Sequence, residues 1–119
     1  ENVMIPAMIG GKSQSVALEQ AMILLNKVGL SDRAKHRPNE ISGGEQQRIA
    51  VCRSLINNPK VVLADEPTGN LDSRNTAELQ ELFFKLREDL NQTFIIVTHN
   101  QSLASQADRM IVMQDGLLV

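Results

Sequence analysis

The sequence predicts an α/β protein, with a helical first half and a second half in which strands and helices alternate. In the first half, apolar residues recur at helical spacing over 15–28 and over 44–57. In the second half, residues 61–64 and 94–97 are uninterrupted apolar runs with a long helical pattern between them. Such runs are typical of strands that are buried on both faces of a parallel sheet.

The helices of the first half have recognisable ends. A short apolar segment and then a loop occupy the first dozen residues. The helix over 15–28 is expected to end at Gly29, and residues 31–41 are polar and predict a loop. The second helix, over 44–57, stops at Asn58-Pro59, because the residue before a proline is disfavoured in helical conformation.

Acidic residues and a histidine follow the two apolar runs of the second half. The strand over 61–64 is followed by Asp65 and Glu66, and the strand over 94–97 leads to His99. Ligands of parallel sheets bind at the carboxyl ends of the strands. These three side chains are therefore candidates for a functional site.

Four further elements complete the predicted second half. A long helix covers 73–90, a short helix covers 101–106, and a third strand covers Met110 to Met113. Gln114-Asp115-Gly116 is a hairpin-like turn, after which residues 117–119 begin an antiparallel edge strand.

Composition restricts the class of function. The net charge is -2, from 12 basic and 14 acidic residues, which argues against a nucleic-acid partner. The single cysteine, Cys52, allows no internal disulfide and is expected to be a small core residue. No apolar run reaches the roughly 18 residues that a membrane-spanning helix needs, so any work at a membrane would require another subunit to cross it.

The run Ser42-Gly43-Gly44-Glu45 has two physical interpretations. It matches a capping box, in which the serine hydroxyl and the glutamate carboxylate satisfy free amides at a helix start. A cap does not need two glycines, which cost about 1 kcal/mol each inside a helix. Glycines at a helix start let a bulky anion approach the free amides, so the run is also a candidate phosphate-contacting turn.

Four motifs in order resemble those of ABC-type ATPases. Residues 41–48 closely resemble the ABC signature, with Ile41 where leucine is usual. Residues 63–68 look like the Walker B strand, residues 69–72 like the D-loop, and residues 97–99 like the switch histidine. The residue choices look most like the bacterial subgroup of lipoprotein-releasing and macrolide-export ATP-binding subunits.

The resemblance implies a role for each motif. Asp65 would hold Mg²⁺, Glu66 would act as the general base on the attacking water, and His99 would sense the γ-phosphate of ATP. The signature would contact ATP held by a partner subunit, and the D-loop would lie near the shared boundary, where Asp72 could cap the next helix, cross to the partner, or both. The signature residues are Ser42, Gly43, Gly44, Glu45 and Gln46, and those of the D-loop are Asn70, Leu71 and Asp72.

The fold implied by the resemblance is part of a P-loop NTPase fold of the ABC ATPase type. Residues 1–57 would form a helical subdomain that includes the signature helix, and residues 58–119 the C-terminal part of the α/β ATPase core. We expect the N-terminal half of this fold to be missing, since the chain starts at Glu1 and has no G-x-x-x-x-G-K-[ST] loop. Gly10-Gly11-Lys12-Ser13 comes near, but Pro6 stands where the first glycine is needed.

The implied function is that of an ATP-binding and ATP-hydrolysing subunit of an ABC transporter complex. Closure of an ATP-bound homodimer would drive export or lipoprotein release through integral membrane permease subunits, which would hold the protein at the cytoplasmic face of the membrane. The 119 residues alone are expected to be inactive. Two alternatives stay open: an ABC-type ATPase of DNA maintenance, and a non-catalytic binding module.

Overall fold

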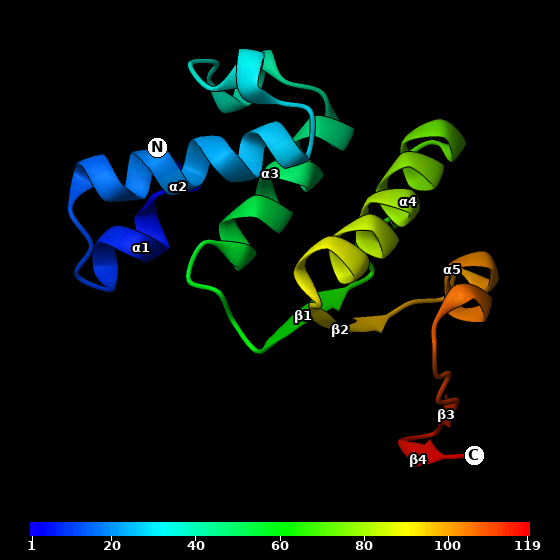
Figure 1. Cartoon of the computed structure of the whole chain (residues 1–119). Coiled ribbons are helices and arrows are strands. Elements are labelled where there is room, and N and C mark those ends of the chain that lie inside the picture. The colour runs from blue at the N-terminus through cyan, green and yellow to red at the C-terminus, as the bar shows by residue number, and fades with distance from the viewer.

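The computed structural model describes residues 1–119, which form an elongated molecule measuring 47 × 29 × 25 Å. Three helices and two short 3-10 turns come first, and helices and strands then alternate (Figure 1). The elements are α1 (Ile5–Ile9), α2 (Gln14–Lys27), η1 (Ser31–Arg33), η2 (Pro38–Glu40), α3 (Gly43–Leu55), β1 (Val61–Asp65), α4 (Ser73–Leu90), β2 (Thr93–Val97), α5 (Gln101–Gln106), β3 (Met113–Gln114) and β4 (Leu117–Leu118).

The helical half follows the prediction closely, except at its start. The first residues contain helix α1 rather than only an apolar segment and a loop, and Pro6 lies in its first turn, where a missing amide hydrogen costs nothing. Helix α2 begins after Ser13, whose hydroxyl oxygen accepts a bond from the Val16 amide. The chain leaves α2 through Gly29, whose φ of 75° is one that glycine adopts without strain.

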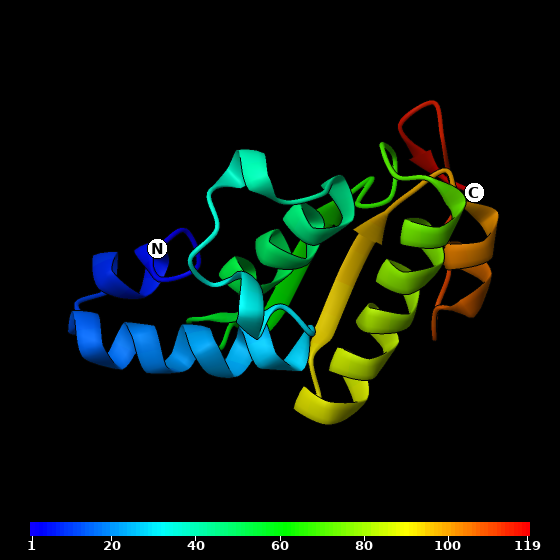
Figure 2. The same ribbon diagram turned by 90° about the horizontal axis from the view of Figure 1, so that it is seen from above.

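The central sheet consists of β1 and β2, which run parallel and are joined by α4. Their register pairs Val61 with Thr93 and Asp65 with Val97, so the carboxyl ends of both strands lie at the same edge. Figure 2 shows α4 lying along β2, with α3 on the side of β1.

One face of this sheet is open, and the prediction of strands buried on both faces was wrong. Val62 is 6% exposed and lies against the helices, whereas Leu63 is 76% and Ile95 54% exposed. Adjacent residues of a strand point to opposite faces. Helices α3 and α4 both pack against the face that carries Val62. The opposite face, which carries Leu63 and Ile95, is therefore left uncovered.

The predicted third strand at Met110 to Met113 was also wrong. Only Met113 joins a strand, and β3 pairs antiparallel with β4 in a separate two-stranded hairpin. No strand lies beside residues 110–112 to extend the ladder from β2. The hairpin turn itself is confirmed, since Asp115 and Gly116 both have positive φ angles, 50° and 80°, as a two-residue type I′ turn requires.

The core runs through both halves of the chain as one cluster of 17 buried residues. Residues of α2 and α3 meet residues of α4 and Val62 there, and Phe83 of α4 packs edge-on against Phe94 of β2 at 5.2 Å between ring centres. Cys52 is a fully buried member of this cluster, which confirms its predicted place. Burial raises the pKa of its thiol to about 12, against an ordinary value of 9.0.

Candidate functional site

The first turn of α3 contains the predicted capping box. The Ser42 hydroxyl oxygen accepts a hydrogen bond from the Glu45 amide at 3.2 Å, and the Glu45 carboxylate accepts one from the Ser42 amide at 3.0 Å. The box therefore satisfies two backbone amides at the boundary of the helix. Arg33 lies 3.6 Å from the same carboxylate and joins η1 to this turn.

The two glycines of this turn differ in their surroundings. A Cβ on Gly44 would lie 2.1 Å from Oδ1 of Asn75, so any larger residue there would clash with the present position of the Asn75 side chain. A Cβ on Gly43 would meet only Cδ2 of Leu71, at 3.9 Å, and Gly43 is exposed. Sequence reasoning missed the packing role of Gly44, and only Gly43 leaves open backbone at the helix start.

Gln46 is turned towards the chain that precedes the helix. Its side-chain amide donates to the carbonyl oxygen of Pro38 at 2.9 Å, and more weakly to that of Ile41 at 3.5 Å. The side chains of Glu45 and Gln46 thus stabilise the approach to α3. Contact of either residue with ATP stays a prediction.

Glu66 and His99 come together at the carboxyl edge of the sheet, as the sequence predicted. The distance between Oε1 of Glu66 and Nε2 of His99 is 3.3 Å, and the histidine side chain is 98% exposed. The Glu66 backbone has a φ of 45°, and its amide donates to the carbonyl oxygen of Val97 at 2.8 Å. This positive φ is uncommon for a residue with a side chain and marks a constrained position.

Oε1 of Glu66 is buried and accepts no hydrogen bond in the structure, although the residue as a whole is only partly buried. A buried polar atom without a partner costs free energy, and such atoms concentrate at functional positions. Nε2 of His99 lies near it, and solvent reaches the imidazole freely. The arrangement provides a carboxylate that can accept a proton, beside an imidazole that can orient a ligand.

Asp65 ends β1 and is exposed beside Glu66. The structure gathers no group of three or more potential metal-ligating side chains. Mg²⁺ is usually bound through one or two carboxylates together with water and substrate phosphates. A site built on Asp65 fits that pattern, and the chain would contribute the carboxylate.

The D-loop segment is a tight turn between β1 and α4. The Gly69 amide donates to the Glu66 carbonyl oxygen at 3.0 Å, and the Leu71 amide donates to that of Thr68 at 3.2 Å. Oδ1 of Asp72 then accepts a bond from the Asn75 amide at 2.8 Å and caps α4. The capping role foreseen for Asp72 is confirmed, and its role towards a partner subunit stays a prediction.

The Gly10–Ser13 segment connects two helices. It follows α1, Ser13 caps α2, and the Lys12 ammonium donates to the Gln20 side chain at 2.8 Å. A phosphate-binding P-loop instead follows a strand. The segment therefore serves as a turn and a helix cap in this structure.

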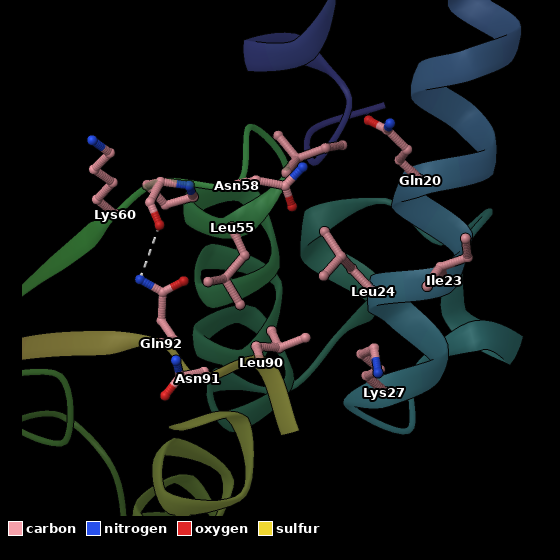
Figure 3. A pocket seen from close by; sticks show the side chains of 12 residues that line it. Gln20, Ile23, Leu24, Lys27, Leu55, Asn58, Lys60, Leu90, Asn91 and Gln92 are labelled. Atoms are coloured by element: carbon pink, nitrogen blue, oxygen red, sulfur yellow. Dashed lines mark hydrogen bonds between the residues drawn. The ribbon is translucent and has the colours of Figure 1, made fainter. Parts of the chain in front are cut away.

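Two cavities of about 540 Å³ each lie at different distances from these motifs. One runs beside β1 and is lined by Asp65, Pro67 and residues of α3 such as Gln47. Figure 3 shows the other, where Gln92 and Lys60 lie at the amino ends of the strands, away from Glu66 and His99. The cavity beside β1 is the one that adjoins the candidate site.

Comparison with known proteins decides the family. A family model described as ABC transporter matches residues 2–69, which is more than half of the 119 residues. The chain belongs to the ABC transporter family. It is 57% identical over its whole length to the lipoprotein-releasing system ATP-binding protein LolD of Cytophaga hutchinsonii, and 58% identical over 99% of its length to LolD of Bacteroides thetaiotaomicron.

The structural likeness agrees with this family. A dimeric bacterial ABC transporter cassette superposes with a TM-score of 0.79 at 40% identity, over 98% of this chain and 52% of that one. An inward-facing metal-chelate type ABC transporter gives a TM-score of 0.90 at 25% identity, over 99% of this chain and 49% of that one. The fold is thus part of an ABC ATPase fold, and the chain spans 54% of the length of both LolD relatives.

None of the helices combines the length and the hydrophobicity that crossing a membrane requires. The longest, α4, covers 18 residues and has polar residues along one side.

Proposed function

We propose that the chain is part of an ATP-hydrolysing subunit of an ABC transporter that releases or exports lipoproteins. The LolD relatives, which are named lipoprotein-releasing system ATP-binding proteins, support the transport class. The single observation that carries the enzymatic part is the Glu66–His99 pair, in which a buried carboxylate oxygen faces an exposed imidazole at 3.3 Å.

In this proposal Glu66 accepts a proton from the water that attacks ATP, and His99 positions that water and the γ-phosphate. The carboxylate oxygen accepts no hydrogen bond in the structure, so it can accept one from a substrate water once the atoms that cover it move aside. Asp65 would hold Mg²⁺ through water, and the ion would supply positive charge next to the phosphates. Each residue occupies the carboxyl edge of the sheet, where ligands of parallel sheets bind.

The signature would act on ATP held by a second subunit. Ser42 and Gly43 are exposed at the first turn of α3, where helix amides favour an anion. We propose that Ser42 to Gln46 close on the partner's ATP, with Asn70, Leu71 and Asp72 at the boundary. The related cassette of known structure is described as dimeric, which supports a homodimer as the working form.

The remaining parts of the proposal concern organisation. Residues 1–57 would act as the helical subdomain that meets permease subunits, and residues 58–119 as part of the ATPase core. The permeases would hold the protein at the cytoplasmic face of the membrane. We expect the 119 residues by themselves to hydrolyse no ATP, because a signature needs ATP bound by another subunit's phosphate loop.

The test compares the two histidines of the chain in the complete protein that contains these residues. His99→Ala and Glu66→Gln should each lower kcat for ATP hydrolysis by about 10²-fold or more, because each removes a group that acts on the attacking water. His36→Ala is the matched control, since His36 is exposed and none of the side-chain hydrogen bonds involves it. Equal activity of all three variants and the wild type would refute the assignment.

Two further measurements separate the alternatives. A non-catalytic binding module would show no magnesium-dependent hydrolysis in the complete wild-type protein. An ATPase of DNA maintenance would be stimulated by duplex DNA, whereas a transport ATPase would respond to its permease subunits reconstituted in vesicles. The net charge of -2 supports the transport reading over the DNA reading.

A further inference from the structure

The first turns of α3 and α4 fit together through a single side chain. Asn75 lies so close to Gly44 that a Cβ there would stand 2.1 Å from Oδ1 of Asn75 and 2.7 Å from its Cγ. The side chain therefore occupies the space left by the missing Cβ. Gly43, one residue earlier, faces Leu71 at a looser 3.9 Å.

The other end of the same side chain holds the D-loop. Nδ2 of Asn75 donates a hydrogen bond to Oδ1 of Asp72 at 3.0 Å. The backbone amide of Asn75 donates to that same oxygen at 2.8 Å. Two bonds to one oxygen fix the rotamer of Asp72 more firmly than the helix cap alone.

An ion cluster joins the two helices about one turn further along. Arg48 of α3 pairs with Glu78 of α4, and Arg74 of α4 reaches the second oxygen of that carboxylate at 3.0 Å. The Arg48 side chain is 22% and the Glu78 side chain 37% exposed, so the pair lies near the surface and links the helices mainly through its geometry. The ion cluster links the middle of α3 to the first half of α4, and Asn75 connects the first turns of the two helices.

We propose that Asn75 is a positioning residue that ties Asp72 to the signature turn, so that the signature and the D-loop move as one unit when subunits close. This inference rests on the proposed function, because it assigns Asn75 a part in ATP-driven closure. The side-chain amide of Asn75 can link the two motifs because it makes two contacts at the same time. It fills the space beside Gly44, and it donates a hydrogen bond to Asp72. Without the side-chain amide, Asp72 keeps only the cap bond from the Asn75 backbone amide and loses its link to the group that contacts Gly44.

The first experiment tests the contact by a double-mutant cycle on the unfolding equilibrium of the complete protein. Gly44→Ala should destabilise the wild type through overpacking against Asn75. In the Asn75→Ala background the same change should be neutral or stabilising, because the space is vacated and alanine favours helix. Coupling of at least about threefold in the unfolding constant is expected.

The control for the cycle pairs Gly44→Ala with Asn26→Ala. Asn26 is an exposed asparagine within α2, and its side chain makes no hydrogen bond. The effects of this pair should be additive. If the effects of Gly44→Ala and Asn75→Ala on the free energy of unfolding are also additive, the proposed contact between Gly44 and Asn75 is refuted.

The second experiment separates hydrogen bonding from space filling in ATP hydrolysis. Asn75→Ser and Asn75→Ala leave similar space, but only serine keeps a side-chain donor at this position. Asn75→Asp keeps the shape and removes the donor. The expected order of kcat is asparagine, serine, alanine and then aspartate, with a loss of about tenfold for alanine and KM within about twofold.

The possible results lead to distinct conclusions. Wild-type kcat in all three variants, or wild-type kcat in Asn75→Asp together with equal losses in the other two, overturns the positioning role. A complete wild-type protein that hydrolyses no ATP refutes the proposed function instead. The double-mutant cycle alone then tests the contact between Gly44 and Asn75.

Discussion

At the scale of single residues, Glu66 combines two unfavourable features. Its φ of 45° lies in the left-handed region, and its Oε1 is buried without a hydrogen bond. Each costs on the order of 1–3 kcal/mol. The fold tolerates the left-handed backbone and the unpaired oxygen at the acidic residue that directly follows β1 and faces His99. Unfavourable features at such a position are expected when a residue is retained for its chemical role.

Replacing Glu66 by glycine should therefore stabilise the fold while abolishing hydrolysis. Glycine adopts positive φ without steric cost, and the change removes the unpaired oxygen, so we expect a gain of about 1 kcal/mol in the free energy of unfolding. Urea denaturation measures it. Asn58→Gly is the control, since Asn58 has a φ of 50° but asparagine tolerates that region. A loss of stability in Glu66→Gly would contradict the strain argument.

Cys52 gives a prediction for pH. Its pKa of about 12 means that only about one thiol in 10⁴ is ionised at pH 8, so a disulfide reagent should modify Cys52 only in denaturant. In the unfolded chain the thiol ionises near its ordinary value of 9.0. The contribution of Cys52 to stability is thus complete below pH 9 and falls as the pH rises towards 12. Fast modification of the native protein at pH 8 would contradict this.

At the scale of elements, α3 depends on its first turn. The capping box at Ser42 and Glu45 satisfies two amides that the helix itself cannot. The same turn contains the exposed Gly43. The residues that stabilise the start of the helix therefore also fix the position of the backbone that we propose contacts a phosphate. Cap and candidate site therefore share one structure.

Removing the cap should be measurable as stability. Ser42→Ala is expected to lower the free energy of unfolding by about 1 kcal/mol, because the Glu45 amide loses its acceptor. Ser73→Ala is the matched control: it is also an exposed serine in a first helical turn, but Asp72 supplies the cap there. Chemical denaturation should leave the control within about 0.5 kcal/mol of wild type. Equal losses in both variants would mean that the cap is not the cause.

The types of most elements could be predicted from local pattern, while their surroundings could not. Helices α2, α3 and α4 have the predicted positions within two residues, because apolar spacing and end signals are local properties. Helix α1 was missed, since five residues show too little periodicity. Met110 to Met113 have strand composition, but a strand needs a partner: only Met113 joins a ladder, and next to it a single bond runs from the Val119 amide to the Val112 carbonyl oxygen.

At the scale of the whole molecule, the open face of the central sheet is the main unbalanced feature. Leu63, Ile95 and Val97 are 76%, 54% and 60% exposed on the face opposite to Val62. Clustered apolar side chains on a sheet with free edges favour association. The chain alone therefore has a reason to self-associate that is independent of ATP.

We expect Leu63→Lys to reduce that association. A charge in the centre of the open face raises the cost of covering it, so sedimentation velocity at increasing concentration should show less oligomer than wild type. Leu18→Lys is the control. Leu18 is also an exposed leucine, 50% accessible, but it lies on α2, away from the open face of the sheet. A wild-type chain that stays monomeric at high concentration would contradict the prediction.

The family motifs, the fold class and the nearness of Glu66 to His99 follow from the order and pattern of the residues, because parallel strands bring their carboxyl ends to one edge whatever surrounds them. Tertiary structure alone decided that Gly44 makes room for Asn75, that the Glu66 backbone is left-handed, and that one sheet face is open. These features depend on which distant segments pack together, and spacing along the chain carries no record of that contact.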